Sequence, residues 1–213
     1  QTLENIKNNI ILSGSDSSDL SIIGRITPLL LVSKTKEEFL ENVEKFVKLT
    51  HNSNKAISAS RFFANWLLET LGGNDLNESL EKLKTQSDTH IQALISRGVA
   101  SKNEDTFQTI REFGPACDIE EGFSGIVHLL SKYTNLKDML INNAKAGGDS
   151  SARAMIAAAI LMSNQSISQI PQNWLAIKVL LPLLKRTNLN LQHLKKVLQM
   201  LVSLLYLLLQ HLQ

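Results

Sequence analysis

The sequence predicts an all-α protein, on three observations. Only 4 prolines and 10 glycines interrupt its 213 residues, so long stretches of chain are free to form helices. Apolar residues recur three and four positions apart through most of the chain, which is the period of one face of an α-helix. No segment has the pattern of a β-strand. We therefore expect a bundle of helices.

The two clearest helices lie in the first third of the chain. Thr35 and Glu38 form a capping box, in which a hydroxyl and a carboxylate satisfy free amides at a helix start. The apolar positions of 39–47 then form one stripe. A second helix is expected over about 54–71, where the pair Gly72-Gly73 ends it.

The middle of the chain is less regular. The apolar positions of 76–83 and 91–98 predict further helices. The stretch 113–125 is predicted as turns, because it contains Gly-Pro and two more glycines without apolar periodicity. A buried helix is then expected over 126–133.

Two more helices follow. Asn135 is expected to cap a helix that ends at Gly147-Gly148. Asp149 then opens an alanine-rich helix that runs to about Met162, and its small side chains suit tight packing at the centre of a bundle.

The chain is divided into a helical domain over 1–175 and a leucine-rich tail over 176–213. Within the tail, 200–209 is almost wholly apolar, but charged or polar residues flank it too closely for a bilayer span of about 20 residues. We expect the tail to cause self-association, since one packing face cannot bury apolar residues on every side of a helix.

Composition excludes several classes of function. A formal net charge of +2 gives no electrostatic case for binding nucleic acid. One cysteine, Cys117, excludes an internal disulfide and a multi-cysteine zinc site, and fits the reducing cytoplasm. The first residues show no basic segment followed by an apolar run, so a signal peptide is not expected. The missing start methionine suggests a processed chain or a fragment that is incomplete at its N-terminus.

The most informative segment is Gly147-Gly148-Asp149-Ser150-Ser151-Ala152-Arg153. Its glycines let the backbone approach a ligand or metal closely, and the helix start that follows offers free amides and a positive dipole end. The alternative is structural: the glycines end one helix and Asp149 caps the next. The local sequence favours the cap, since capping aspartates are common.

Several ordered motifs resemble the ADP-ribosylglycohydrolase family, in particular the branch with the J-type lens crystallins. Gly147-Gly148-Asp149 and the small-residue helix precede Ile170-Pro171-Gln172-Asn173-Trp174-Leu175, as in the family's C-terminal signature. The upstream matches are Arg25-Ile-Thr-Pro28, Leu49-Thr50-His51, and Phe113-Gly-Pro-Ala-Cys117 with Gly122-Phe123. The resemblance as a whole spans roughly 22–175.

This resemblance implies an orthogonal all-α bundle around a two-magnesium cleft, which hydrolyses the glycosidic bond between ADP-ribose and an acceptor. It implies Asp149 as a metal ligand and ADP-ribose or an ADP-ribosylated acceptor as the ligand. The residues expected to bind that ligand are Gly147, Gly148, Ser150, Ser151, Arg153 and His51.

The sequence departs from the family pattern in two places. The family's Thr-Asp-Asp triplet and early Gly-Asp motif are absent. Active members continue the Gly-Gly-Asp loop with a second Asp and a Thr, where this chain has Ser151 and Ala152. One carboxylate, Asp149, cannot build a site for two cations. The sequence therefore predicts a family member that is inactive or incomplete as this chain; the alternative is a non-catalytic, crystallin-like protein.

Other candidate residues have simpler interpretations. His51 is expected to cap or pack at a helix end. Cys117 and His128 together could suggest a thiol nucleophile, but a buried free cysteine usually acts as a small apolar residue. Asp19 lies in a serine-rich loop that is expected to be solvated, and His90 is expected on a helix surface. No residue is assigned a catalytic role.

Overall fold

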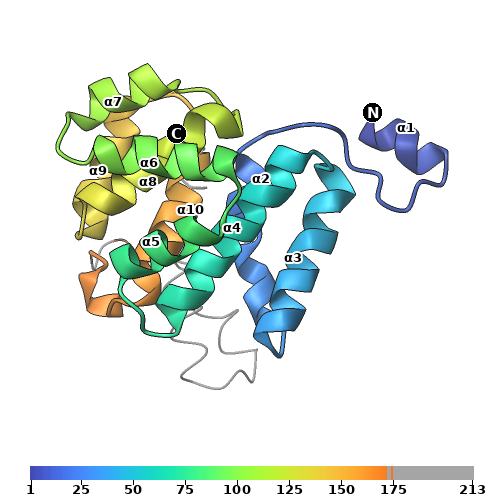
Figure 1. The fold of residues 1–213 in the computed structure, drawn as a ribbon, viewed down its shortest axis with the longest axis horizontal. Coiled ribbons are helices and arrows are strands. Elements are labelled where there is room, and N and C mark those ends of the chain that lie inside the picture. The colour runs from blue at the N-terminus through green and yellow to red at the C-terminus, as the bar shows by residue number, and fades with distance from the viewer. Residues whose placement is uncertain (172–173, 175–213) are drawn as a thin grey trace.

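Ten α-helices and no β-strand make up the part of the chain that the computed structural model describes, residues 1–171 and Trp174 (Figure 1). This confirms the all-α prediction. The leucine-rich tail over 176–213 lies outside the described residues. In chain order the helices are α1 (Thr2–Lys7), α2 (Ser21–Gly24), α3 (Lys36–Thr50), α4 (Asn54–Leu71), α5 (Leu76–Gln86), α6 (Thr89–Ala100), α7 (Thr106–Phe113), α8 (Ile119–Lys132), α9 (Leu136–Ala146) and α10 (Ser150–Ser163), with short 3₁₀ turns at Thr27–Leu31 and Ile167–Gln169.

Side-chain caps fix where the helices begin. Thr35 accepts a hydrogen bond from the Glu38 amide at the start of α3, and the Glu38 carboxylate in turn accepts one from the Lys34 amide. Ser53 caps α4 and Asn135 caps α9, each through an amide three residues further on. Each cap satisfies an amide that has no partner within its own helix.

The turn predicted over 113–125 is wrong in its second half. Helix α8 begins at Ile119, because Asp118 caps it by accepting from the Glu120 amide. Gly122, which suggested a turn, lies inside the helix where a Cβ atom would come within 2.3 Å of Leu20. The glycine therefore allows close packing and does not end the helix. Helix α7 was not predicted either.

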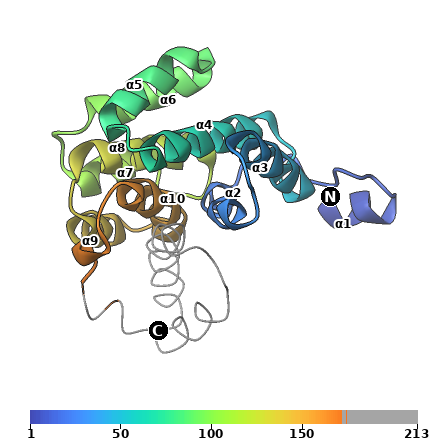
Figure 2. The same ribbon diagram turned by 90° about the horizontal axis from the view of Figure 1, so that it is seen from below.

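Helix α10 forms the centre of the bundle. It packs against α2, α4, α8 and α9, and Figure 2 shows it between these elements. Its small residues Ala154, Ala157, Ala158 and Ala159 are fully buried, which lets the neighbouring helices approach its backbone. On α4 and α8, Phe62, Phe63, Trp66 and Phe123 form a contiguous aromatic cluster in the core.

A buried polar network joins α6, α7 and α8. His128 on α8 is fully buried, and its Nδ1 and Nε2 each lie 2.9 Å from a hydroxyl, of Ser101 and Thr106 respectively. The Thr106 hydroxyl also lies 2.7 Å from the Tyr133 hydroxyl. Burial lowers the pKa of His128 to about 4, so the ring is neutral at pH 7.

None of the helices in the described residues combines the length and the apolar character that crossing a membrane requires.

Candidate functional site

The loop between α9 and α10 has a backbone that requires glycine. Gly147 and Gly148 have φ angles of 74° and 63°, in the left-handed region. A Cβ atom on Gly148 would lie 2.0 Å from the carbonyl oxygen of Pro115. The next amide, of Asp149, donates to that same carbonyl over 2.8 Å. Both glycines allow the positive φ angles, and Gly148 also allows the close approach of this loop to the loop over 114–118.

Asp149 caps α10. Its Oδ1 accepts hydrogen bonds from the Ala152 amide at 3.1 Å and from the Ser151 hydroxyl at 3.0 Å. Ser150 contributes through its backbone, because its carbonyl accepts from Asn143 Nδ2 at 2.8 Å. Asp149 therefore makes the hydrogen bonds of a helix cap, the structural role that the local sequence favours.

Arg153 lies beneath this loop and is fully buried. Its Nε donates to Asn143 Oδ1 at 2.9 Å, Nη1 lies 3.5 Å from the Pro115 carbonyl oxygen, and Nη2 donates to the Gly147 carbonyl. Burial lowers its pKa to about 10, and the charge of Asp149 opposes that fall. The guanidinium is therefore charged at pH 7 and ties the two loops together from inside.

The serine-rich loop over 13–19 is the other side of the site. It pairs with the end of α3, where the Gly14 amide donates to Lys48 O at 2.9 Å and the Asn52 amide donates to Ser15 O at 2.6 Å. It also pairs with the start of α8, where the Ile119 amide donates to Ser18 O at 2.9 Å. This loop, which was expected to be solvated, therefore joins two segments that are distant from it in sequence, the end of α3 and the start of α8.

Asp19 is the best connected side chain of that loop. Partial burial works against its ionisation, but hydrogen bonds from the hydroxyl and amide of Ser21 and from the Cys117 thiol outweigh it and lower its pKa. His51 lies close enough to interact with the Asp19 charge, although burial lowers the pKa of the imidazole overall. His51 Nδ1 also lies 2.8 Å from the Thr50 hydroxyl.

Cys117 connects the two sides of the site. The negative charge of Asp19 is the main reason that its thiol pKa is raised, and Asp149 adds a smaller effect in the same direction. The thiol is exposed, so the sequence-based expectation of a buried cysteine is wrong. The general tendency of free cysteines to be buried does not apply here, because Cys117 follows Gly-Pro-Ala in a surface loop. His128 is engaged with Ser101 and Thr106, which leaves no Cys117–His128 pair.

A cavity of about 360 Å³ opens beside Cys117. We call this cavity the cleft. It is lined by carboxylates, hydroxyls and one thiol, from Asp16, Ser17, Ser18, Asp19, Cys117 and Asp118. None of the six was predicted as a site residue. Asp19 and Asp118 meet as a backbone bridge between positions that are 99 residues apart, which local sequence patterns do not reveal.

The structure divides the seven predicted site residues into two groups. Gly147, Gly148, Asp149, Ser150 and Ser151 lie together at the start of α10, with Arg153 buried below them. His51 lies on the other side, next to Asp19. Arg153 was expected to bind ligand, but its polar contacts are all internal.

The donor set around Asp149 does not fit a two-magnesium centre. Within residues 1–171 and Trp174, no group of three or more His, Cys, Asp or Glu side chains is arranged to hold a metal ion. Asp149 already accepts two hydrogen bonds at one oxygen, and the positive charge of Arg153 acts on it. Magnesium requires oxygen ligands in near-octahedral geometry, and a nearby cation opposes its binding.

Comparison with known proteins gives two findings. A family model described as ADP-ribosylglycohydrolase matches residues 1–196. Among curated proteins, the chain is similar to Crystallin J1A of Tripedalia cystophora, with 22% identity over 178 residues, which cover 83% of this chain and 55% of the relative. Crystallin J1B of the same organism is 21% identical over the same coverage. The chain thus spans about half the length of these curated relatives.

Proposed function

The chain belongs to the ADP-ribosylglycohydrolase family, and from this premise we propose that it keeps a family scaffold with a ligand-binding cleft but does not by itself hydrolyse ADP-ribosyl bonds. The ligand we propose is ADP-ribose or an ADP-ribosylated acceptor. The Ser18 hydroxyl donates to Asp118, but the Asp19 and Asp118 carboxylates each have a lone pair left to accept from a sugar hydroxyl. A volume of about 360 Å³ is typical of small-molecule sites.

The observation that best supports a chain without hydrolase activity is the environment of Asp149. It is the one carboxylate of the Gly-Gly-Asp loop, it caps α10, and a buried guanidinium lies beneath it. Because the proposed reaction depends on paired magnesium ions, a loop with a single engaged carboxylate supports binding without catalysis. The likeness to two proteins named crystallins supports a non-catalytic role as well.

A second candidate is a hydrolase whose metal ligands lie outside this sequence. The relatives are nearly twice as long as the matched region, which favours this reading. In that case a longer version of the protein, with a Thr-Asp-Asp triplet, would hydrolyse a substrate that this chain only binds.

Two further proposals rest on sequence. The leucine-rich segment over 176–213 is proposed to mediate self-association, and a cytoplasmic location is proposed from the use of a single cysteine.

An ADP-ribose release assay tests the main proposal. We expect the chain, incubated with an ADP-ribosylated protein in magnesium buffer, to release no more ADP-ribose than a protein-free control. An active full-length family member run in parallel shows that the substrate is competent. Magnesium-dependent release that is lost in Asp149→Asn would contradict the proposal.

Binding is measured separately. We expect calorimetry with ADP-ribose to show an interaction that Asp19→Asn weakens. Asparagine still accepts the hydrogen bonds that Ser21 donates, but its neutral amide oxygen is a weaker acceptor for sugar hydroxyls than a carboxylate oxygen. Asp75→Asn, which changes a helix cap away from the cleft, is the matched control.

A further inference from the structure

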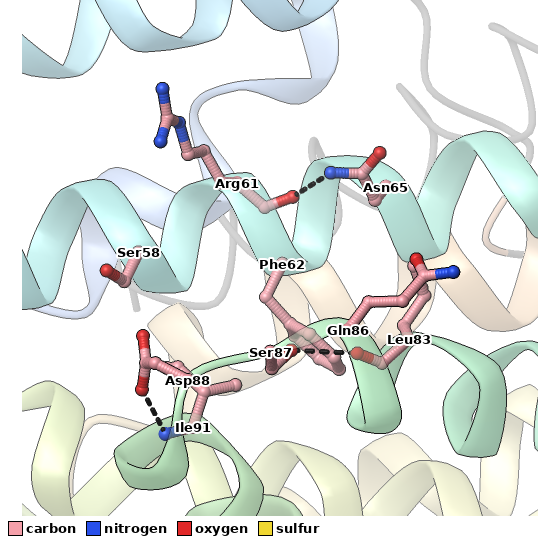
Figure 3. A pocket seen from close by; sticks show the side chains of 9 residues that line it. All are labelled: Ser58, Arg61, Phe62, Asn65, Leu83, Gln86, Ser87, Asp88 and Ile91. Atoms are coloured by element: carbon pink, nitrogen blue, oxygen red, sulfur yellow. Dashed lines mark hydrogen bonds between the residues drawn. The ribbon is translucent and has the colours of Figure 1, made fainter.

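A second cavity lies between α4 and the turn that joins α5 to α6, and Figure 3 shows it from close by. Its volume is about 280 Å³. Three nearly buried apolar side chains, Phe62, Leu83 and Ile91, form its inner wall. No residue lining it also lines the cleft, so the two sites are separate. We call this cavity the elbow pocket.

The polar rim of the elbow pocket has unused hydrogen-bond acceptors. Asn65 Nδ2 donates to the Arg61 carbonyl at 2.8 Å, which leaves the amide oxygen open. The Ser87 hydroxyl donates to the Leu83 carbonyl at 2.8 Å, so the lone pairs of the hydroxyl oxygen remain free to accept. Asp88 uses Oδ1 to accept from the Ile91 amide at 2.9 Å and keeps a second carboxylate oxygen. The rim also includes Ser58 and Gln86, which can donate or accept. The three free acceptors of Asn65, Ser87 and Asp88 favour a ligand with several donors.

The charged side chains at the rim also favour a ligand that donates hydrogen bonds. Arg61 is a cation at its edge, but it pairs with Glu44 and turns its guanidinium away from the pocket in Figure 3. Among the described residues, no ion pair engages the carboxylate of Asp88. The described lining carries one positive side chain, Arg61, which is paired with Glu44, and one negative side chain, Asp88, which has no such pair. The carboxylate of Asp88 is therefore the charge that the pocket offers to a ligand, beside an apolar wall.

We propose that the elbow pocket binds a guanidinium group on an alkyl stem, as in an arginine side chain. A guanidinium carries five N–H donors in a plane, which can serve several acceptors at once, and its flat face and stem can lie against Phe62, Leu83 and Ile91. An ammonium is a compact point charge without such a face. The elbow pocket and the cleft share no lining residue, so this inference does not depend on the function proposed for the cleft.

The test follows backbone amide shifts by NMR while the chain is titrated with a blocked arginine, N-acetyl-arginine-methylamide. We expect saturable shifts at Asn65, Asp88 and Ile91, with an affinity in the millimolar range because the site is partly exposed. The citrulline analogue is isosteric but neutral, and should bind about tenfold more weakly; the lysine analogue should fall between the two.

Two variants test the role of the Asp88 charge, and a peptide ligand distinguishes a polypeptide from a small molecule. Asp88→Asn keeps the cap of α6 but removes the charge, and should weaken binding of the blocked arginine several-fold with an unchanged melting temperature. Asp75→Asn, at the cap of α5, should leave binding unchanged. Tighter binding of an Ac-Gly-Arg-Gly-NH₂ peptide than of free arginine would indicate a polypeptide source, and the reverse a small molecule. Equal binding of citrulline, equal effects of the two variants, or no saturable shift at these amides would overturn the proposal.

Discussion

Replacing Arg153 with alanine is expected to lower the free energy of unfolding by about 3 kcal/mol. The guanidinium is fully buried and serves Asn143 and the carbonyl groups of Gly147 and Pro115. Truncation leaves Asn143 Oδ1 and the Gly147 carbonyl without the donor that Arg153 supplies, whereas the Pro115 carbonyl keeps the Asp149 amide. It also leaves a cavity beside Gly125, where an added Cβ atom would lie 3.1 Å from Arg153 Cδ. Urea unfolding followed by circular dichroism measures the change.

Arg97→Ala is the matched control for this experiment. Its guanidinium is exposed and lies 4.2 Å from the centroid of the Phe113 ring, so its loss should cost less than about 1 kcal/mol. Arg153→Met, which keeps most of the volume without the donors, should remain strongly destabilised. If Arg153→Ala costs no more than Arg97→Ala, Arg153 does not tie the two loops together.

Acidification is expected to remove about 3 kcal/mol of stability through His128 alone. Burial, assisted by the nearby charge of Lys132, lowers its pKa from 6.5 in the unfolded chain to about 4 in the folded one, while the charge of Asp105 opposes the fall. As the pH drops below 6.5, His128 binds a proton in the unfolded state but stays neutral in the folded state until the pH approaches 4. The stability is therefore full above pH 6.5, is lost between pH 6.5 and 4, and then levels off.

The measurement is urea unfolding at a series of pH values between 7 and 4. His128→Gln removes the titrating ring, so its stability should fall less steeply across that window, whatever its stability at pH 7. His90→Gln removes an exposed histidine that pairs with Glu120, and should keep the steep fall. Parallel pH profiles for the parent and His128→Gln would show that the buried network does not control acid stability.

Local signals predicted the fold where they acted within one helix. The cap and the apolar stripe of α3, the Gly72-Gly73 stop of α4, and the Asn135 cap of α9 depend on residues a few positions apart. The start of α8 was missed although its cap, Asp118, is local, because Gly122 suggested a turn. The packing role of Gly122 depends on Leu20, which belongs to another part of the chain.

The site shows the same division more strongly. The capping role of Asp149 follows from its position before a helical stripe, whereas the burial of Arg153 depends on Pro115 and Asn143, which lie outside its helix. Asp19 was not predicted as a site residue, because its contacts with Cys117 and His51 are made across the fold. Single-sequence patterns carry no information about such pairings.

A magnesium titration of the parent chain and of Asp149→Asn tests directly whether the Asp149 loop can hold the paired ions that hydrolysis needs. The melting temperature of each protein is measured at each magnesium concentration. Asparagine caps a helix about as well as aspartate, so without magnesium the two proteins should melt at nearly the same temperature. We expect a weak magnesium-dependent rise in the melting temperature of the parent that disappears in Asp149→Asn, because one carboxylate cannot hold paired cations. A large, saturable rise in the parent, or one that survives the substitution, would contradict it.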